Sequence, residues 1–416
     1  MAGSGRGSGR PPPPPQYGLR DLLFALLGVG AFAADLVADL WAAASYVRAG
    51  HAVWGGLVLL LLGLSSLAVQ GFSWAWYQTE PGESDLPPGL RLAALHLLQL
   101  GYPYRCCRAL RVGWRVCRDE TAFEEDQAYA VFLTHDISML RLFETFLENT
   151  PQLTLVLAII LHTNKAELFQ GLGICTAFLS VAWSLLDYHQ SLRSFLQDKY
   201  ELRPLSSTIY FLWNFLLVCP RVLAIALFAV LFPYGVALHF LSVWAAMLLW
   251  VWLQGTVFME SPRWEWLYRV TVAVILYFCW FNVAKGRTLY RSVIYHGFIL
   301  VDSMLLAGSS FWYSAPLRER PYLLPVLLVG LFCYMFGLLL RGAYYKWFHP
   351  RLQAPCKAAY DEVDAPHGLD EDAVFRAVPA PAPMNRRLYQ LAQNHFSVSL
   401  QARQNWGNGV MDNMAL

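Results

Sequence analysis

The side chains that could do chemistry in this chain are charged residues set inside long apolar stretches. Asp35 and Asp39 are four residues apart, so a helix would place both carboxylates on one face. Arg141, Glu144 and Glu148 follow one another at spacings of three and four, which puts them on one face of another helix. A carboxylate attracts cations and amines, and a guanidinium binds phosphate well. These stripes predict a site for a charged ligand.

Further polar side chains interrupt other apolar stretches. Asp187 lies in a row with Ser180, Ser184 and Ser191 at helical spacing. An ionisable side chain near the centre of a bilayer costs about 2.5–3.5 kcal/mol, so it usually faces a partner or a polar cavity. One interpretation is that these residues form buried ion pairs that only lock the helices together. Carboxylates outnumber arginines, however, which argues against a fully paired network. The other members of the set are Asp136, Gln152, Arg221 and Asp302.

The functional interpretation of this set is a polar track for a charged ligand. A phospholipid headgroup fits, since its phosphate suits Arg141 or Arg221 and its amine suits the carboxylates. The acyl chains would remain in the hydrocarbon. The sequence contains no GxxxxGK[ST] loop, so nothing in it indicates ATP-driven pumping, and movement would be downhill. Trp54 could gate such a track, although tryptophans at membrane interfaces more often form belts.

The composition places the chain in a membrane. Of its 416 residues, 56% are hydrophobic and only 14% are charged, with a mean hydropathy of +0.38, which is too apolar for a soluble globular protein. The 31 Lys and Arg nearly balance the 29 Asp and Glu, so the overall charge gives no reason to expect a nucleic-acid partner.

Eight apolar runs are long enough to cross a bilayer. They cover residues 22–47, 53–77, 168–193, 206–232, 236–256, 267–284, 292–312 and 322–346. Residues 91–103 are too few to cross, and residues 127–162 are polar in their first half and broken at Pro151. We expect both stretches to be re-entrant or partly buried. The predicted fold is an all-α polytopic membrane protein, with the helical bundle in residues 21–347.

The two ends of the chain differ from the bundle in composition. Residues 1–20 are rich in Gly, Ser, Arg and Pro, which favours a disordered arm. Residues 348–416 form a polar tail that contains a tetrapeptide with the pattern of a caspase site. A caspase needs an aspartate before the cut, and a small residue after it. Asp364 and Ala365 meet these two conditions. The predicted site consists of Asp361, Glu362, Val363, Asp364 and Ala365.

The caspase site sets an expected orientation. The site must face the cytosol, and the Arg-bearing N-terminal arm favours the same side. An even number of crossings, such as eight, satisfies both conditions, so we predict that both termini are cytosolic. The basic residues between Arg105 and Arg118 then lie inside, as the positive-inside rule expects, whereas the loop 193–203 lies outside, against the rule.

The tail beyond the caspase site contains a short amphipathic pattern. Leu388, Leu391 and His395 share one face of a helix predicted over residues 384–396. This helix could plug a cytosolic cleft until cleavage releases it. A basic amphipathic segment that rests on anionic lipid is the alternative.

No catalytic constellation is recognisable in the sequence. His135 and Asp136 are adjacent, but no Ser or Cys nucleophile, HEXXH pattern or metal-ligand spacing accompanies them. We therefore expect no enzyme, no cofactor and no bound metal. The acidic residues leave activation by Ca²⁺ as an alternative.

Several runs carry a resemblance to a known family. Residues 136–148, followed by Pro151, Gln152 and Leu153, resemble the signature core of the XK-related membrane proteins. Residues 35–41, 96–102, 186–189 and 250–256 extend the likeness over nearly the whole chain, and it is strongest to the caspase-activated subgroup.

The resemblance implies a phospholipid scramblase of the plasma membrane, which caspase cleavage activates and which exposes phosphatidylserine on dying cells. It also implies a single-span immunoglobulin-type glycoprotein, basigin or neuroplastin, as the partner needed for surface delivery. The family's intramembrane charged track would correspond to Asp35, Asp39, Asp136, Arg141, Glu144, Glu148, Asp187, Arg221 and Asp302.

Two other functions fit the same residues. Broken helices and intramembrane carboxylates also suit a solute transporter or channel. A membrane scaffold that transports nothing is the other possibility. Whether lipid would move through an internal cavity or over a surface groove is left open by the sequence.

Overall fold

The computed structural model describes most of the apolar part of the chain and one segment of the tail. The described residues are 17–79, 89–119, 124–164, 168–195, 204–283, 288–313, 323–348 and 385–396. Within these ranges the regular secondary structure is entirely helical, which confirms the all-α fold.

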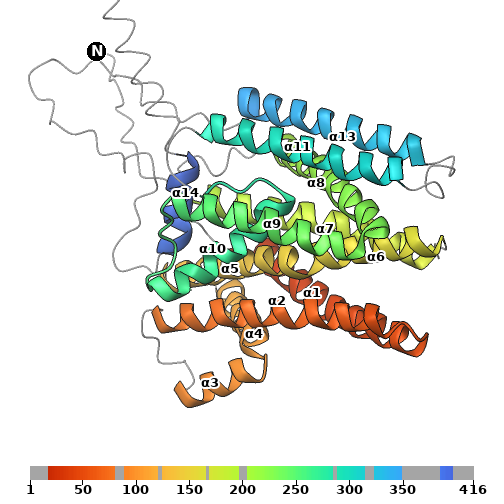
Figure 1. The fold of residues 1–416 in the computed structure, drawn as a ribbon. Coiled ribbons are helices and arrows are strands. Elements are labelled where there is room, and N and C mark those ends of the chain that lie inside the picture. Colours follow the sequence, from red (N-terminus) through yellow and green to blue (C-terminus); the bar gives the residue numbers. More distant parts are fainter. Residues whose placement is uncertain are drawn as a thin grey trace, which may run out of the picture.

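The helices follow one another with short connections (Figure 1). Their bounds are α1 Leu19–Arg48, α2 Ala52–Thr79, α3 Gly89–Leu97, α4 Gly101–Arg118, α5 Glu124–Glu144, η1 Thr145–Asn149, α6 Thr150–Thr163, α7 Leu168–Arg193, α8 Pro204–Leu231, α9 Pro233–Leu253, α10 Pro262–Phe278, α11 Thr288–Tyr313, α13 Leu323–Ala343, η3 Tyr344–Phe348 and α14 Arg386–Phe396.

Six of the described helices are long and apolar enough to cross a membrane: α1, α2, α8, α9, α11 and α13. They coincide with six of the eight predicted spans. Helices α7 and α10 occupy the positions of the other two, and α10 has only 17 residues, most of them buried inside the bundle. The chain is therefore a polytopic membrane protein.

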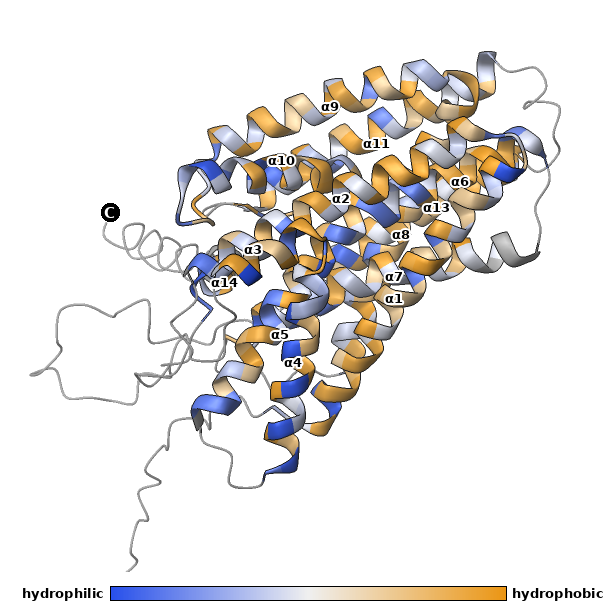
Figure 2. Ribbon diagram, turned by 90° about the horizontal axis from the view of Figure 1, so that it is seen from below, coloured by the Kyte–Doolittle hydropathy of each residue, from blue (hydrophilic) through white to orange (hydrophobic). Residues whose placement is uncertain are grey.

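Helix α8 forms the centre of one half of the bundle, where it packs against α6, α7, α9, α11 and α13. Helices α1 and α2 form a hairpin on the other side, against α4 and α5. Large apolar side chains on α1, α2, α9, α11 and α13 point outward, and Figure 2 shows the hydrophobic colour running along these outer helices. Such a surface is suited to contact with lipid chains.

The two stretches expected to be re-entrant are each built from more than one helix. Residues 91–103 cover the end of α3 and the start of α4, with a break at Gln99, whose φ is 61°. Residues 127–162 form α5, the π-helical turn η1 and α6. Because Pro151 has no N–H, it cannot bond to the carbonyl of Leu147. The wider turn η1 lies just before it, and there the Thr150 N–H bonds to the carbonyl of Thr145.

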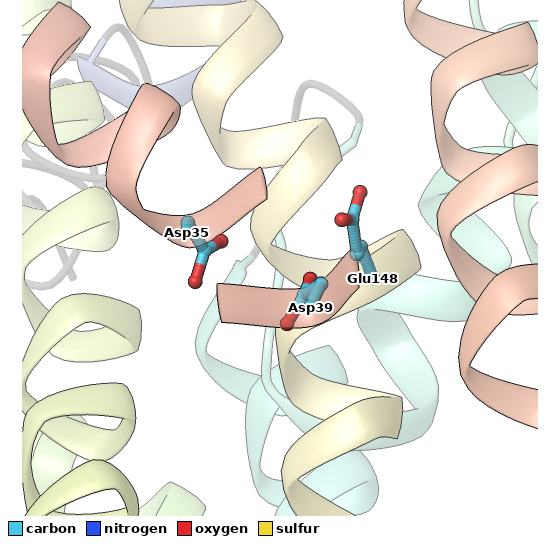
Figure 3. Close-up of side chains that lie close together, drawn as sticks. All are labelled: Asp35, Asp39 and Glu148. Atoms are coloured by element: carbon cyan, nitrogen blue, oxygen red, sulfur yellow. The ribbon is translucent and has the colours of Figure 1, made fainter. Parts of the chain in front are cut away.

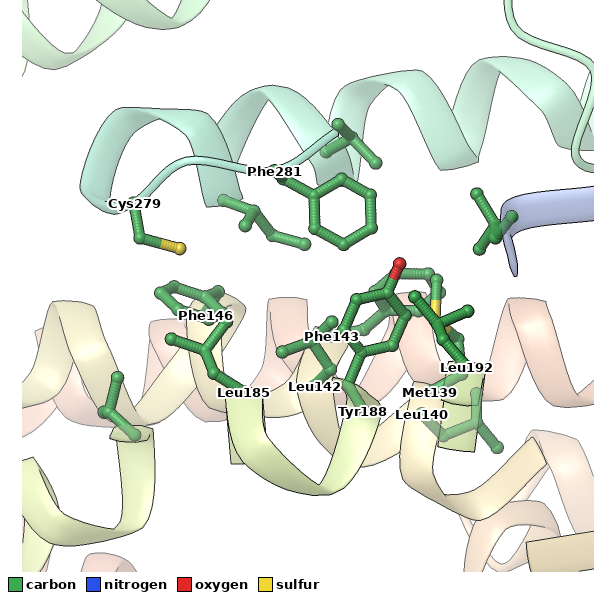
Figure 4. Close-up of a cluster of buried hydrophobic side chains, with 14 of the residues drawn as sticks. Met139, Leu140, Leu142, Phe143, Phe146, Leu185, Tyr188, Leu192, Cys279 and Phe281 are labelled. Atoms are coloured by element: carbon green, nitrogen blue, oxygen red, sulfur yellow. The ribbon is translucent and has the colours of Figure 1, made fainter. Parts of the chain in front are cut away.

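A buried apolar cluster supports this irregular segment. Phe143 and Phe146 of α5 and η1 pack with Leu185 and Tyr188 of α7 (Figure 4). Phe281, beyond the end of α10, stacks on Tyr188 with ring centroids 5.4 Å apart. Close packing on this face leaves another face of η1, which contacts α2, to carry Glu148 toward Asp35 and Asp39 of α1.

Candidate functional site: buried charges along the bundle

Three carboxylates from α1 and η1 meet inside the bundle. Asp35, Asp39 and Glu148 each place a carboxylate oxygen within 4.8 Å of the others. Figure 3 shows the three side chains close together. Asp39 and Glu148 are buried, and Asp35 is partly buried. The helical repeat aligns the two aspartates, whereas Glu148 reaches them from the π turn. Gln152 of α6 donates a hydrogen bond from Nε2 to Asp39.

No cation of the protein neutralises this cluster among the described residues. The ion pairs between described residues do not include Asp35, Asp39, Glu144 or Glu148. The side-chain carbonyl oxygens of Asn149 and Gln152 are also buried without a hydrogen-bond partner. Carboxylate and amide oxygens suit either a hard divalent cation such as Ca²⁺ or an ammonium group. The site is thus built to accept positive charge.

An arginine and an aspartate stand beside this cluster. Arg141 Nη1 lies 3.5 Å from a carboxylate oxygen of Asp187 in α7, and the two side chains are 21% and 29% exposed. Glu144 lies close enough to Asp35 and Arg141 to interact with both electrostatically. Arg141 is therefore partly accessible and only loosely paired, which leaves guanidinium donors for an anionic ligand.

Gly28 of α1 makes room for Arg141. A Cβ atom at position 28 would collide with the Arg141 guanidinium, whereas a Cβ at Gly30 would meet nothing within 4 Å. Gly28→Ala is thus expected to displace Arg141 from Asp187 and to lower the free energy of unfolding by about 1–3 kcal/mol, as overpacking does. Gly30→Ala is the matched control. Equal apparent melting temperatures of the two purified variants would contradict this role for Gly28.

Asp136 lies at the centre of a second polar cluster. Its side chain is fully buried and accepts a hydrogen bond from Arg105 Nη1 of α4 at 2.6 Å. Asn385 Nδ2 donates to it at 2.6 Å, and Arg387 Nη2 lies 3.1 Å from Oδ1 and 3.3 Å from Oδ2. The carboxylate therefore joins α4 and α5 to the tail.

The tail helix α14 docks on the bundle around this contact. Asn385 accepts a hydrogen bond from the Leu388 N–H and so caps the helix. Leu388 and Leu391 are buried, and Tyr389 packs edge-on against Phe195. The predicted amphipathic helix is present and its two leucines face the bundle. The side chain of His395 lies outside the described part of the chain, as do residues 361–365 of the predicted caspase site.

A third cluster lies between α8, α9 and α11. Arg221 Nη1 lies 2.5 Å from Asp302 Oδ2, and its Nε donates to the carbonyl of Tyr277. His239 bridges the other oxygen of Asp302 and the Tyr277 hydroxyl, with both distances at 3.0 Å. Arg221 and Asp302, which were both predicted to belong to the polar track, thus pair with each other, as the interpretation of buried ion pairs expects.

Trp54 lies at the end of the α1–α2 hairpin in an aromatic group. Its ring stacks on His51 with centroids 4.2 Å apart and meets Tyr46 and His162 edge-on. His162 belongs to the end of α6, so Trp54 connects the hairpin to the helix that carries Gln152. This position is compatible with the gate and with the belt.

The predicted site residues thus fall into separate groups rather than one continuous chain of contacts. The sequence interpretation missed Arg105, Asn385, Arg387 and His239. Arg105 could have been found, because Tyr102, Cys106 and Ala109 lie on the same buried face of α4. The contacts of Asn385 and Arg387 depend on how the tail docks, which has no local signal.

The fold and these buried charges define an all-α polytopic membrane protein with a charge-lined interior. Comparison with known proteins identifies the family. A sequence model described as XK-related protein matches residues 23–350. The XK-related protein 8 of Pan troglodytes is 53% identical over 380 residues, which cover 91% of this chain and 94% of the relative. The XK-related protein 8 of Tetraodon nigroviridis is 44% identical over 92% of this chain and 97% of the relative. The chain belongs to the XK-related family.

Proposed function

We propose that this protein is a phospholipid scramblase of the plasma membrane. It would move lipids in both directions without ATP and expose phosphatidylserine when an executioner caspase cuts its tail. The observation that carries the proposal is the cluster of Asp35, Asp39 and Glu148, which are close together, largely buried and without a cationic partner among the described residues. A site of this kind is made for a ligand that brings its own positive charge.

The geometry suits a zwitterionic or amine-bearing headgroup. The headgroup amine would bind the carboxylates, and Arg141 would bind the phosphate. Gln152 stays bonded to Asp39 and keeps that carboxylate in place. The apolar outer faces of α1 and α2 offer a surface along which acyl chains can remain in the hydrocarbon. Arg221 and Asp302, being paired, would position helices rather than bind the headgroup.

The docked tail helix supplies the restraint in this proposal. The caspase motif, 361–364, lies between the end of the bundle at Phe348 and the cap of α14 at Asn385. A tethered helix has a high effective concentration at its docking surface, and a cut in the connecting segment removes that advantage. Asp136 would keep its bond to Arg105 after α14 leaves, so the released bundle has no unpaired buried charge at this point.

The proposed orientation and partner of the protein rest on its resemblance to the caspase-activated XK-related proteins. Both termini would be cytosolic, where a caspase can reach the tail. Basigin or neuroplastin would be the partner that takes the protein to the cell surface.

The decisive experiment is lipid exchange by the purified protein in liposomes that contain fluorescent phospholipid. Caspase treatment is expected to accelerate bleaching of the inner-leaflet label, and Asp364→Ala is expected to abolish this response while leaving the protein folded. The same liposomes report cation flux through an entrapped indicator. Cation flux without lipid exchange would indicate a channel and not a scramblase. Absence of both cation flux and lipid exchange after complete cleavage, with basigin or neuroplastin also present, would favour a scaffold.

A further inference from the structure

A second charged site lies at the end of the bundle that carries the tail helix. Arg341 is in the last turn of α13, just before the π-helical turn η3. In Figure 1 this end of α13 and α14 lie at the same end of the molecule. Tyr344 of η3 bonds to His189 near the end of α7, close to Phe195, which contacts α14. Arg341 is therefore near the level at which a transmembrane helix meets lipid headgroups.

Arg341 is buried but has no counter-ion among the residues that the structure describes. Its residue exposure is 7%, and it makes no hydrogen bond or ion pair with any residue that the structure describes. Its Nη1 atom is fully buried and has no hydrogen-bond partner in the described part of the chain. The guanidinium lies among the rings of Trp213, Trp280 and Tyr345, at 5.2, 5.8 and 5.6 Å from their centroids. Aromatic rings attract the cation, but they accept no conventional hydrogen bonds in the guanidinium plane.

Two other unpartnered polar atoms lie in the same region. Trp213 Nε1 and His296 Nε2 are both buried without a hydrogen-bond partner. Both residues line one small pocket between α8, α11 and α13. The Tyr334 hydroxyl lies 3.3 Å from His296 Nδ1 and 3.2 Å from the His296 carbonyl oxygen. Because the Tyr334 hydroxyl donates its one proton to the His296 carbonyl, Nδ1 is the ring nitrogen that donates to the hydroxyl, and Nε2 is the acceptor of the neutral imidazole.

Arg341 and Trp213 are thus donors without an acceptor among the described residues. A guanidinium and an indole N–H match the oxygens of a phosphate group, and no carboxylate competes for Arg341 among the described residues. We propose that Arg341 and Trp213 form a binding site for the phosphate of a phospholipid at the tail end of the bundle. The proposal deepens the proposed function, since it requires headgroups to enter from that leaflet.

The test measures binding, not transport. Purified full-length protein in detergent is titrated with dihexanoyl phosphatidylcholine, and the rise in its apparent melting temperature is recorded. Wild type is expected to be stabilised, and Arg341→Gln is expected to weaken the apparent affinity by about tenfold or more, because a hydrogen bond to a charged group is lost. Arg341→Lys should retain part of the affinity.

Arg48→Gln is the matched control, because Arg48 also ends a spanning helix beside a tryptophan ring, at 6.0 Å from the centroid of Trp41, but is exposed. Trp213→Phe keeps the ring and removes the indole N–H. It should also weaken binding, which keeps the proposal testable if Arg341→Gln does not fold. Any stabilisation by dihexanoylglycerol, which lacks the phosphate, should be the same in wild type and Arg341→Gln.

Equal stabilisation of wild type, Arg341→Gln and Trp213→Phe would overturn the site. Stabilisation by inorganic phosphate alone, with the same dependence on Arg341, would overturn its assignment to lipid. Because no lipid exchange is measured, failure of this site and failure of the scramblase proposal give different results.

Discussion

The double variant Asp39→Asn, Glu148→Gln is expected to reduce lipid exchange by the caspase-cleaved protein at least about tenfold. Each carboxylate would lose a charge-assisted hydrogen bond to the headgroup amine, and such a bond contributes about 1.5–3 kcal/mol. The thermal stability of the variant should stay the same or rise, because two buried carboxylates without cationic partners among the described residues are removed. Exchange in liposomes and the apparent melting temperature are measured on the same preparation.

Lipid exchange and thermal stability are expected to change in different ways in the double variant. A purely structural role for the cluster would lower stability and exchange together. Glu125→Gln removes an exposed carboxylate at the start of α5 and serves as the control. Exchange that is unchanged in the double variant would exclude the cluster from the lipid path.

A bound cation is the competing occupant of the same three carboxylates. If chelation of Ca²⁺ abolishes exchange by the wild type, the cluster acts by holding a cation between α1 and η1, and not by binding the headgroup amine. If exchange survives chelation and still depends on Glu148, the headgroup assignment stands.

The helical elements and part of the site could be predicted from the sequence, for different physical reasons. Apolar runs of the right length identify spanning helices directly, because the bilayer fixes that length. The pairing of Asp35 with Asp39 follows from the helical repeat alone. The arrival of Glu148 beside them does not, since it depends on the π turn η1 before Pro151, and a pattern of regular period cannot reveal an extra residue in a turn.

Contacts between distant segments were the least predictable part. The positive-inside rule predicts only that the basic residues between Arg105 and Arg118 lie on the cytosolic side, and it gives no sign that Arg105 is fully buried against Asp136. The amphipathic face of α14 was predicted through Leu388 and Leu391, which are buried as expected. That Asn385 and Arg387 reach Asp136 is a consequence of docking, which local sequence does not encode.

The tail contact leads to the second large prediction. Asn385→Ala combined with Arg387→Ala is expected to give lipid exchange without caspase, at a rate approaching that of the cleaved wild type. The two side chains donate charge-assisted hydrogen bonds to Asp136 at 2.6 and 3.1 Å. At about 1.5–3 kcal/mol each, their loss would weaken docking of α14 by roughly two to four orders of magnitude. Docking weakened to this extent is not maintained by the effective concentration, in the millimolar range, that a covalent connection provides.

Arg386→Ala is the matched control, because Arg386 carries the same charge one position away but is exposed. It should leave the uncleaved protein silent. Release of α14 is followed independently through a cysteine crosslink between positions 389 and 195, whose side chains are in contact in the docked state. If the double variant loses the crosslink and yet exchanges no lipid before cleavage, departure of α14 is not sufficient, and activation needs a further step such as dimerisation. If it loses the crosslink and exchanges lipid, the bond between the tail and Asp136 is the restraint that the caspase removes.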